Sequence, residues 1–209
     1  MRPSRLVPLA LAALLPGCAA LSALEGGPER DVFELRPPAF GQTSCGRGRV
    51  AELVIETPKA RGTLDSERIM IRPSPLQTQY LPDAEWGDTV PVMLQRLLVQ
   101  GLGSYDAFSH VGRAPLGLSG DFALISEIEA FNARVDGEAV TVRLAVNAQM
   151  IHEMDASVVS RGNFNVEIPA ASSKTSDLIP AFDLAGQELT AQMTEWGLRA
   201  TGINPASCR

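Results

Sequence analysis

Cys18 is the residue whose position indicates chemistry most clearly. It follows a segment with the layout of a secretory signal, in which Arg2 and Arg5 give a positive start and an apolar run occupies residues 6–15. That run is too short to cross a bilayer, which needs about 20 apolar residues. We therefore expect residues 1–17 to be a signal peptide that is removed, which leaves Cys18 at the new N-terminus.

The stretch Leu15-Pro16-Gly17-Cys18 resembles the bacterial lipobox, with a small residue directly before the cysteine. A cysteine thiol in that position accepts a diacylglycerol as a thioether, and the freed amine takes a further acyl chain. Several chains anchor a protein stably, whereas one gives only marginal binding. Residues 18–30 are expected to be a lipidated tether and residues 31–209 the folded domain. The alternative is an ordinary signal peptide with a chance cysteine.

Two cysteines remain if Cys18 is lipidated, namely Cys45 and Cys208. A secreted protein folds in an oxidising compartment, where disulfides persist. A Cys45–Cys208 bridge would close a loop of almost the whole domain, which is worth about 4–5 kcal/mol in the chain-entropy model. The alternative is a pair of free thiols.

Catalytic groups do not form a recognisable set in this sequence. The chain has two histidines, His110 and His152, and Ser109 next to His110 would point to the opposite face of a strand. No C-x-x-C or His pair has the spacing of zinc ligands. Gly101 and Gly103 imitate a dinucleotide loop but end a helix instead of opening one. We predict no enzymatic activity, no metal and no cofactor.

Two further groups of residues have both a functional and a structural interpretation. Glu127 and Glu129 share one strand face, where a solvated surface is a simpler explanation than acid–base chemistry. Tyr80 and Trp86 could line a groove for a ligand or partner. The competing interpretation of Trp86 is that it packs the start of a helix onto the sheet.

Length and charge narrow the class of protein. The chain of 209 residues suits one domain, and its net charge of −6 argues against nucleic-acid binding and against a polybasic grip on membranes. Helices are predicted over residues 88–103, with Pro91 in the first turn, and from Pro180 to Gly202. The segment 170–177 is predicted to be a polar linker.

Alternating apolar residues predict most of the strands. The strongest signal is a hairpin that joins a strand over 121–133 to one with Val140, Val142, Leu144 and Val146 facing inward, through Asp136-Gly137. Further strands are predicted over 31–36, 50–56, 68–72, 76–81, 108–111 and 156–168. At least six strands with two helices at separated positions indicate a single α/β or α+β domain.

Three segments resemble the ABC-type transport auxiliary lipoproteins, the PqiC-like partners of MCE-type lipid transport systems. They are Tyr80-Leu-Pro-Asp-Ala-Glu-Trp86 with the following helix, the segment Asp121–Phe131 with its hairpin partner, and the opening strand Val32–Leu35 after Cys18. The family often has arginine before the tryptophan, where this chain has Glu85. The resemblance implies an α/β fold of three layers, with a mixed β-sheet and two main helices in a single domain.

The same resemblance implies a non-catalytic protein at the periplasmic side of the outer membrane, with the inner membrane as the alternative. Its partners would be an MCE-domain protein with the associated ABC permease and ATPase, and its system would move phospholipids between the two membranes. The membrane is reached through the lipid anchor, and a homo-oligomer is left open. A second hypothesis is a lipoprotein that acts as a scaffold or activator of a cell-wall synthase.

Overall fold

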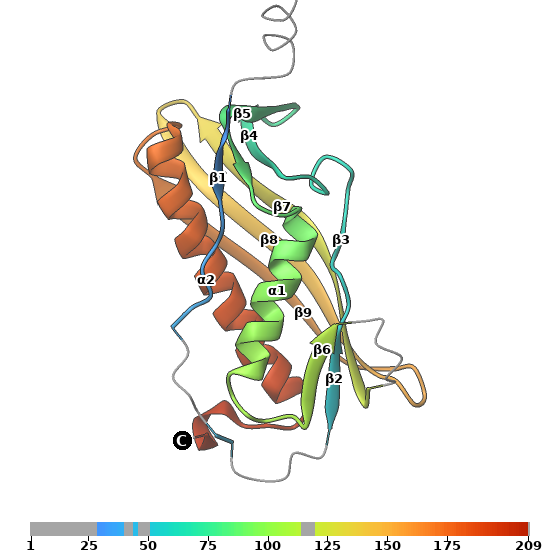
Figure 1. The fold of residues 1–209 in the computed structure, drawn as a ribbon. Helices are drawn as coiled ribbons and strands as arrows, with labels where there is room; N and C mark the ends of the chain where they lie inside the picture. The colour runs from blue at the N-terminus through green and yellow to red at the C-terminus, as the bar shows by residue number, and fades with distance from the viewer. Residues whose placement is uncertain (1–28, 40–43, 46–50, 114–119, 209) are drawn as a thin grey trace, which may run out of the picture.

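The computed structural model describes residues 29–39, 44–45, 51–113 and 120–208. Nine strands, two α-helices and a short 3₁₀ helix lie within these residues (Figure 1). The strands are β1 (Asp31–Phe33), β2 (Glu52–Ile55), β3 (Lys59–Ala60), β4 (Arg68–Ser74), β5 (Gln77–Trp86), β6 (His110–Arg113), β7 (Phe122–Asp136), β8 (Ala139–His152) and β9 (Ser157–Ala170). The helices are α1 (Val90–Gly103), α2 (Thr175–Ala200) and η1 (Pro205–Ser207).

Strand β7 is the centre of one mixed sheet. Along one edge it pairs with β8, which in turn pairs with β9, and both pairings are antiparallel. Along its other edge it meets β2, β3 and β4 one after another, all parallel to it. The sheet continues from β2 to β6 and from β4 through β5 to β1. The predicted α/β class with a mixed sheet and two main helices in a single domain is confirmed.

The predicted hairpin is also confirmed. Asp136 pairs with Ala139, and Gly137 between them has a φ of 62°, a conformation that glycine adopts without strain. The four β8 side chains predicted to face inward, Val140, Val142, Leu144 and Val146, are all buried. Period-2 alternation is therefore enough to place this hairpin with the correct face toward the core.

Both helices are found where they were predicted, but α2 begins earlier than expected. Helix α1 buries the expected face, and α2 ends at a Schellman motif in which Gly202 has a φ of 83° and Ile203 N–H donates to the Leu198 carbonyl at 2.8 Å. The predicted start of α2 at Pro180 is wrong, because the helix begins at Thr175. Its first turn buries Leu178 against the core, and this packing outweighs the backbone donor that Pro180 lacks.

Two prolines lie inside strands that were predicted to stop directly before them. Pro73 lies in β4 and Pro82 in β5, each at a place where the register between the two strands shifts. A proline has no N–H to donate, and at a bulge the ladder needs none. The continuation of β5 past Pro82 carries the chain to Trp86.

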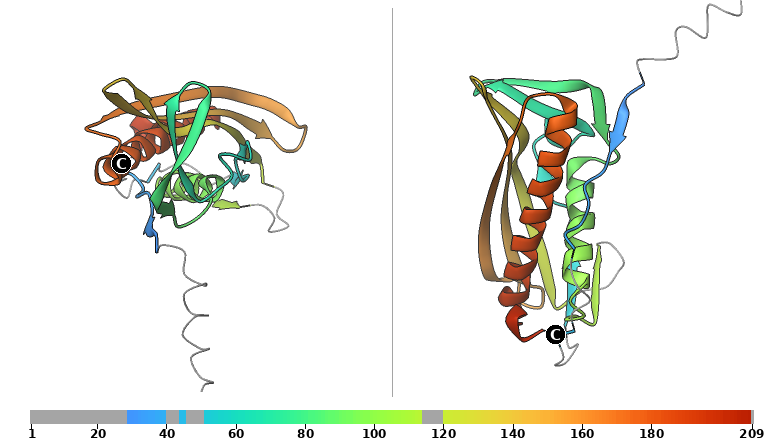
Figure 2. Two further views of the ribbon diagram at one scale, coloured as in Figure 1. Left: turned by 90° about the horizontal axis from the view of Figure 1, so that it is seen from above. Right: turned by 90° about the vertical axis from the view of Figure 1, so that its left-hand side faces the viewer.

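Both helices lie on the same face of the curved sheet, beside one another (Figure 1). The side view in Figure 2 shows the chain after β1 passing over the outer side of the helices. Among the described residues, the third layer is therefore extended chain and not a second layer of helices. Trp86, Phe131 and Phe182 meet in the core, where the Trp86 ring centroid lies 6.0 Å from that of Phe131 and 5.3 Å from that of Phe182.

Candidate functional site

The N-terminal segment, residues 29–39, is fastened along its length to the domain. Its strand β1 pairs with the end of β5, and Gly87 N–H donates to the Phe33 carbonyl at 2.9 Å. The side chain of Leu35, in the middle of the segment, then packs against α2 and is 3% exposed. A Cβ on Gly186 would lie 2.9 Å from the Leu35 side chain, so the glycine gives Leu35 room to approach the helix.

Charged side chains on both helices hold the N-terminal segment in addition. Glu34 accepts from Arg96 of α1 at 3.0 Å. Asp183 of α2 accepts from the Arg36 backbone N–H at 3.0 Å and from the Arg36 guanidinium Nε at 3.1 Å. Gln187 donates to the same carboxylate at 2.8 Å. The sequence did not indicate these pairs, because the partners are far apart along the chain and each is an ordinary surface residue by type.

The surroundings of Asp183 change its pKa in two directions. Burial raises the pKa, and the side-chain and backbone hydrogen bonds from Arg36, the Arg36 charge and the bond from Gln187 lower it. The net result is a pKa below the ordinary aspartate value. The ionised form is therefore stabilised in the folded protein, and this contribution to stability is present above a pH of about 4 and is lost as the pH falls below it.

We expect Asp183→Asn to lower the free energy of unfolding by about 1–2 kcal/mol at pH 7, because the Arg36 bonds lose their charged acceptor. The difference from wild type should shrink below about pH 3, where the wild-type carboxyl also becomes neutral. Urea unfolding at the two pH values measures it. Asp65→Asn is the matched control, since Asp65 is exposed. A loss of equal size at both pH values would contradict the linkage.

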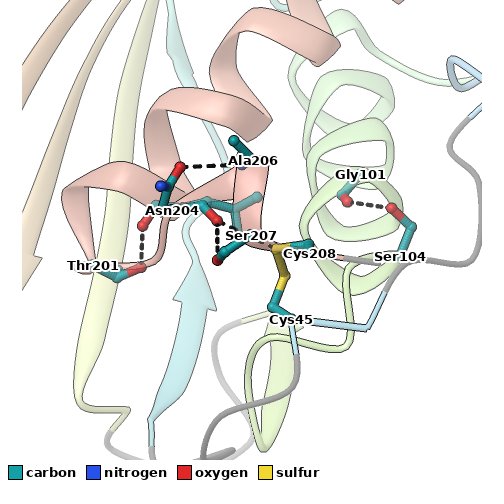
Figure 3. The surroundings of a disulfide bond; sticks show 9 residues. Cys45, Gly101, Ser104, Thr201, Asn204, Ala206, Ser207 and Cys208 are labelled. Carbon is teal, nitrogen blue, oxygen red and sulfur yellow. Dashed lines mark hydrogen bonds between the residues drawn. A yellow bond between two sulfur atoms is a disulfide. The ribbon is translucent and has the colours of Figure 1, made fainter.

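A disulfide joins Cys45, which follows the N-terminal segment in the sequence, to Cys208 (Figure 3). The Cys45 N–H donates to the Tyr105 carbonyl at 3.3 Å, next to the end of α1. Cys208 follows η1, whose first N–H groups are capped by Asn204 through a bond from Ala206 N–H at 3.1 Å. The bridge thus brings the chain at Cys45, beside the end of α1, together with the residues that follow α2.

Trp86 and Tyr80 do not line a common groove. Trp86 is 1% exposed and lies between aromatic rings in the core, so the interpretation as a groove residue is wrong for it. Tyr80 is half-buried, with the Arg68 guanidinium 4.1 Å from its ring centre and its hydroxyl donating to the Thr63 carbonyl at 3.3 Å. Trp86 therefore serves packing, as its structural interpretation predicts, and a role of Tyr80 at a groove stays a prediction.

The two histidines lie in different strands and have no catalytic arrangement. His110 is exposed in β6, where Ser109 uses its hydroxyl to donate to the Ala51 carbonyl. His152 lies 3.2 Å from Asp155 at the turn after β8. The pKa of Asp155 is lowered by hydrogen bonds from the hydroxyl and the backbone N–H of Ser157 and by its bond with His152. The serine bonds the carboxylate and not the imidazole, so these residues do not form a nucleophile–base pair.

Three other expectations concern membranes and metals. Cys18, the predicted lipidation site, lies outside the described residues. Within the described ranges, no helix has the length and apolar character needed to cross a bilayer. The same ranges contain no group of three or more histidine, cysteine or carboxylate side chains placed to hold a metal ion.

The structure is that of a single-domain α/β protein whose N-terminal segment is fastened across two helices by strand pairing and ion pairs, with a disulfide at Cys45 further along the chain. This chain belongs to the family of ABC-type transport auxiliary lipoprotein components, whose model matches residues 33–194. The family is one of accessory lipoproteins, which agrees with an N-terminal segment built for attachment.

One relative in sequence and two solved structures are similar to this chain. Protein bll6063 of Bradyrhizobium diazoefficiens is 25% identical over 194 residues, which are 87% of this chain. The chain spans about half of that relative, 49% of its length. The crystal structure of XCC0632 from Xanthomonas campestris, of family DUF330, is 25% identical with a TM-score of 0.69 and covers 82% of this chain and 97% of its own. A crystal structure of another, uncharacterized protein has the same fold at 15% identity, with a TM-score of 0.62, and covers 80% of this chain and 98% of its own.

Proposed function

We propose that this chain is a lipid-anchored, non-catalytic component of an MCE-type ABC transport system that moves phospholipids between the inner and outer membranes. The family match over residues 33–194 carries the proposal, since it assigns a transport-auxiliary role. Residues 1–17 would be the signal peptide, Cys18 the acylated residue and residues 18–30 the tether. The anchor would hold the domain at the periplasmic side of the outer membrane.

The attachment of the N-terminal segment supports this role. Residues 29–39 lie along the domain from one end, and the C-terminus, next to which the Cys45–Cys208 disulfide lies, is at the other end (Figure 1). A chain that is fastened by β1, by Leu35, by three ion pairs (Arg30–Glu85, Glu34–Arg96 and Arg36–Asp183) and then by a disulfide fixes how the domain is oriented relative to its tether. A fixed orientation is what a docking component needs in order to present one surface to its partners.

Mild crosslinking of membranes, followed by purification of this protein, tests the proposal. An MCE-domain protein should be recovered with the wild type. The Cys18→Ala variant should lose labelled palmitate and should no longer fractionate as a processed membrane protein, because no thioether can form. Leu184→Ser, at an exposed position of α2, is the control that should keep both the label and the partner.

Two results would contradict the proposal. Palmitate that still attaches to Cys18→Ala would disprove the anchor. Recovery of a cell-wall synthase in place of an MCE-domain protein, with normal outer-membrane resistance to detergents, would favour the scaffold hypothesis over transport.

A further inference from the structure

A groove of about 670 Å³ lies on the helix-free face of the sheet. It is formed by the first half of β7, the second half of β8, the connection from β2 to β3 and the turn between β8 and β9. Its lining residues are Glu56, Thr57, Lys59, Ala123, Ile125, Ser126, Glu127, Asn147, Gln149, Ile151, Glu153 and Ala156. The groove is separate from the N-terminal segment, which lies on the helical side.

Apolar side chains of β7 and β8 meet in the floor of this groove, beside the polar side chains of Asn147 and Gln149. Ala123 and Ile151 are paired in register, and Val158 of β9 continues the same row. Ile125, on the same face of β7, is 39% exposed. Seven large apolar side chains are exposed among the described residues. Ile125 lines the groove, and Met154, Val158 and Val159 lie outside its lining, in the turn after β8 and at the start of β9. Exposed apolar surface in and beside a groove is typical of an interaction site.

The rim of the groove is acidic. Glu56, Glu127 and Glu153 line it, and none of these carboxylates has a side-chain hydrogen bond or ion pair within the described part of the chain. Lys59 is the one cation among the lining residues, and it stands opposite Glu127 in register without forming an ion pair. The groove therefore offers an excess of negative charge, three carboxylates against one lysine, beside the apolar side chains of its floor.

The position of the groove restricts what can reach it. Strand β1 enters at one end of the molecule, whereas the turn between β8 and β9 and the strand β2 lie at the other end (Figure 1). The point where the expected tether joins the domain is therefore far from the groove. Carboxylates at the rim also repel anionic headgroups, and a net charge of −6 disfavours a second copy of this acidic chain.

We propose that this groove binds a segment of a partner protein in which apolar residues alternate with lysine or arginine. The apolar side chains would cover Ile125 and Ile151, and the cations would meet the free carboxylates of the rim. Charge complementarity of this kind selects partners and speeds encounter more than it adds affinity. This inference deepens the proposed function, because it names the surface and the chemistry of docking.

A defined peptide tests the groove without the transport system. The probe is a fluorescein-labelled decapeptide of alternating lysine and valine, and its anisotropy is measured with the acylated full-length protein in neutral detergent. We expect Ile125→Ser to weaken binding about tenfold, because it removes apolar surface at the centre of the floor. Glu127→Gln with Glu153→Gln should weaken it about threefold and should reduce its salt dependence. Leu184→Ser, on the helical side, should leave it unchanged.

Several results would contradict the proposal that the groove binds a basic, apolar segment of a partner protein. An alternating glutamate–valine peptide that binds as tightly would remove the charge argument. Sedimentation with phosphatidylglycerol vesicles that depends on Ile125 would identify a membrane surface as the occupant. A change of mass in light scattering with Ile125→Ser would identify a second copy. Thermal unfolding of each variant confirms that it folds, and the two glutamate variants report on the rim if Ile125→Ser does not.

The two experiments test the transport proposal and the proposal that the groove binds a partner segment independently of each other. If the peptide does not bind while the MCE-domain protein is still recovered by crosslinking, only the groove is disproved. If the peptide binds as expected and no MCE-domain protein is recovered, the groove stands and the transport assignment is disproved.

Discussion

Replacing Cys45 and Cys208 together by serine should lower the free energy of unfolding by about 3–5 kcal/mol, the largest loss expected from a change outside the core. The two cysteines are 163 residues apart, so their bond restricts almost the whole unfolded domain. In the folded state the change removes little packing, because η1 keeps its own hydrogen bonds from Ala206 N–H and the Ser207 hydroxyl to Asn204. The loss therefore arises mainly from the greater entropy of the unfolded chain.

Urea unfolding with and without dithiothreitol measures this effect. The wild type should lose stability when it is reduced, and it should then match the double serine variant. The variant itself should not respond to the reductant. Changing both cysteines at once avoids a free thiol that could cross-link two molecules. A wild type whose unfolding midpoint stays the same after complete reduction would contradict the expected contribution.

Trp86→Ala should lower the free energy of unfolding by about 3–5 kcal/mol, which is the usual effect of truncating a large aromatic side chain in a core. Trp86 ends β5 directly before α1, and its ring packs edge-on against Phe131 of β7 and Phe182 of α2. Its removal would leave a cavity at the point where the sheet, α2 and the start of α1 come together. The N-terminal segment would be loosened as well, because Phe33 of β1 pairs in register with Trp86.

Trp196→Ala is the matched control for this prediction. Trp196 is half-buried, packs against Phe164 at 5.6 Å and donates to the Ser160 hydroxyl at 3.2 Å. We expect Trp196→Ala to lower the free energy of unfolding by about half as much as Trp86→Ala does, because less of the Trp196 surface is buried. The two variants are compared by urea unfolding. A loss at Trp196 that equals or exceeds the loss at Trp86 would mean that the three-ring cluster is not the centre of the core.

Elements whose own residues determine their structure were predictable from the sequence. The hairpin of β7 and β8 has strict alternation and an Asp-Gly turn, and α1 has a clear apolar stripe. The start of α2 was not predictable, because what decides it is Leu178 packing into a core that forms only in the folded chain. Pro73 and Pro82 likewise end strands by local rules, and only the register with the neighbouring strand shows that they lie at bulges.

The candidate sites divide in the same way. Cysteine counting led to the Cys45–Cys208 pair that the structure contains, because that inference needed only composition and compartment. The bond between Arg36 and Asp183 joins residues 147 positions apart, and no local pattern marks it. The groove requires the register of β7 with β8, which brings Ala123 beside Ile151. By its residue type and strand position Glu127 is an ordinary solvated residue, and only the folded sheet shows that it stands beside apolar side chains in a groove.

The fastening of the N-terminal segment also has a mechanical consequence. A pull on residue 29 acts along β1, so its bonds to β5 are loaded in shear, all together, and are not opened one at a time. Beyond β1 the force meets Leu35 and the pairs at Arg96 and Asp183, and at Cys45 it divides between the continuing chain and the residues after α2. The domain is thus held from two ends of its sequence at once, and tension does not peel a single strand from its sheet.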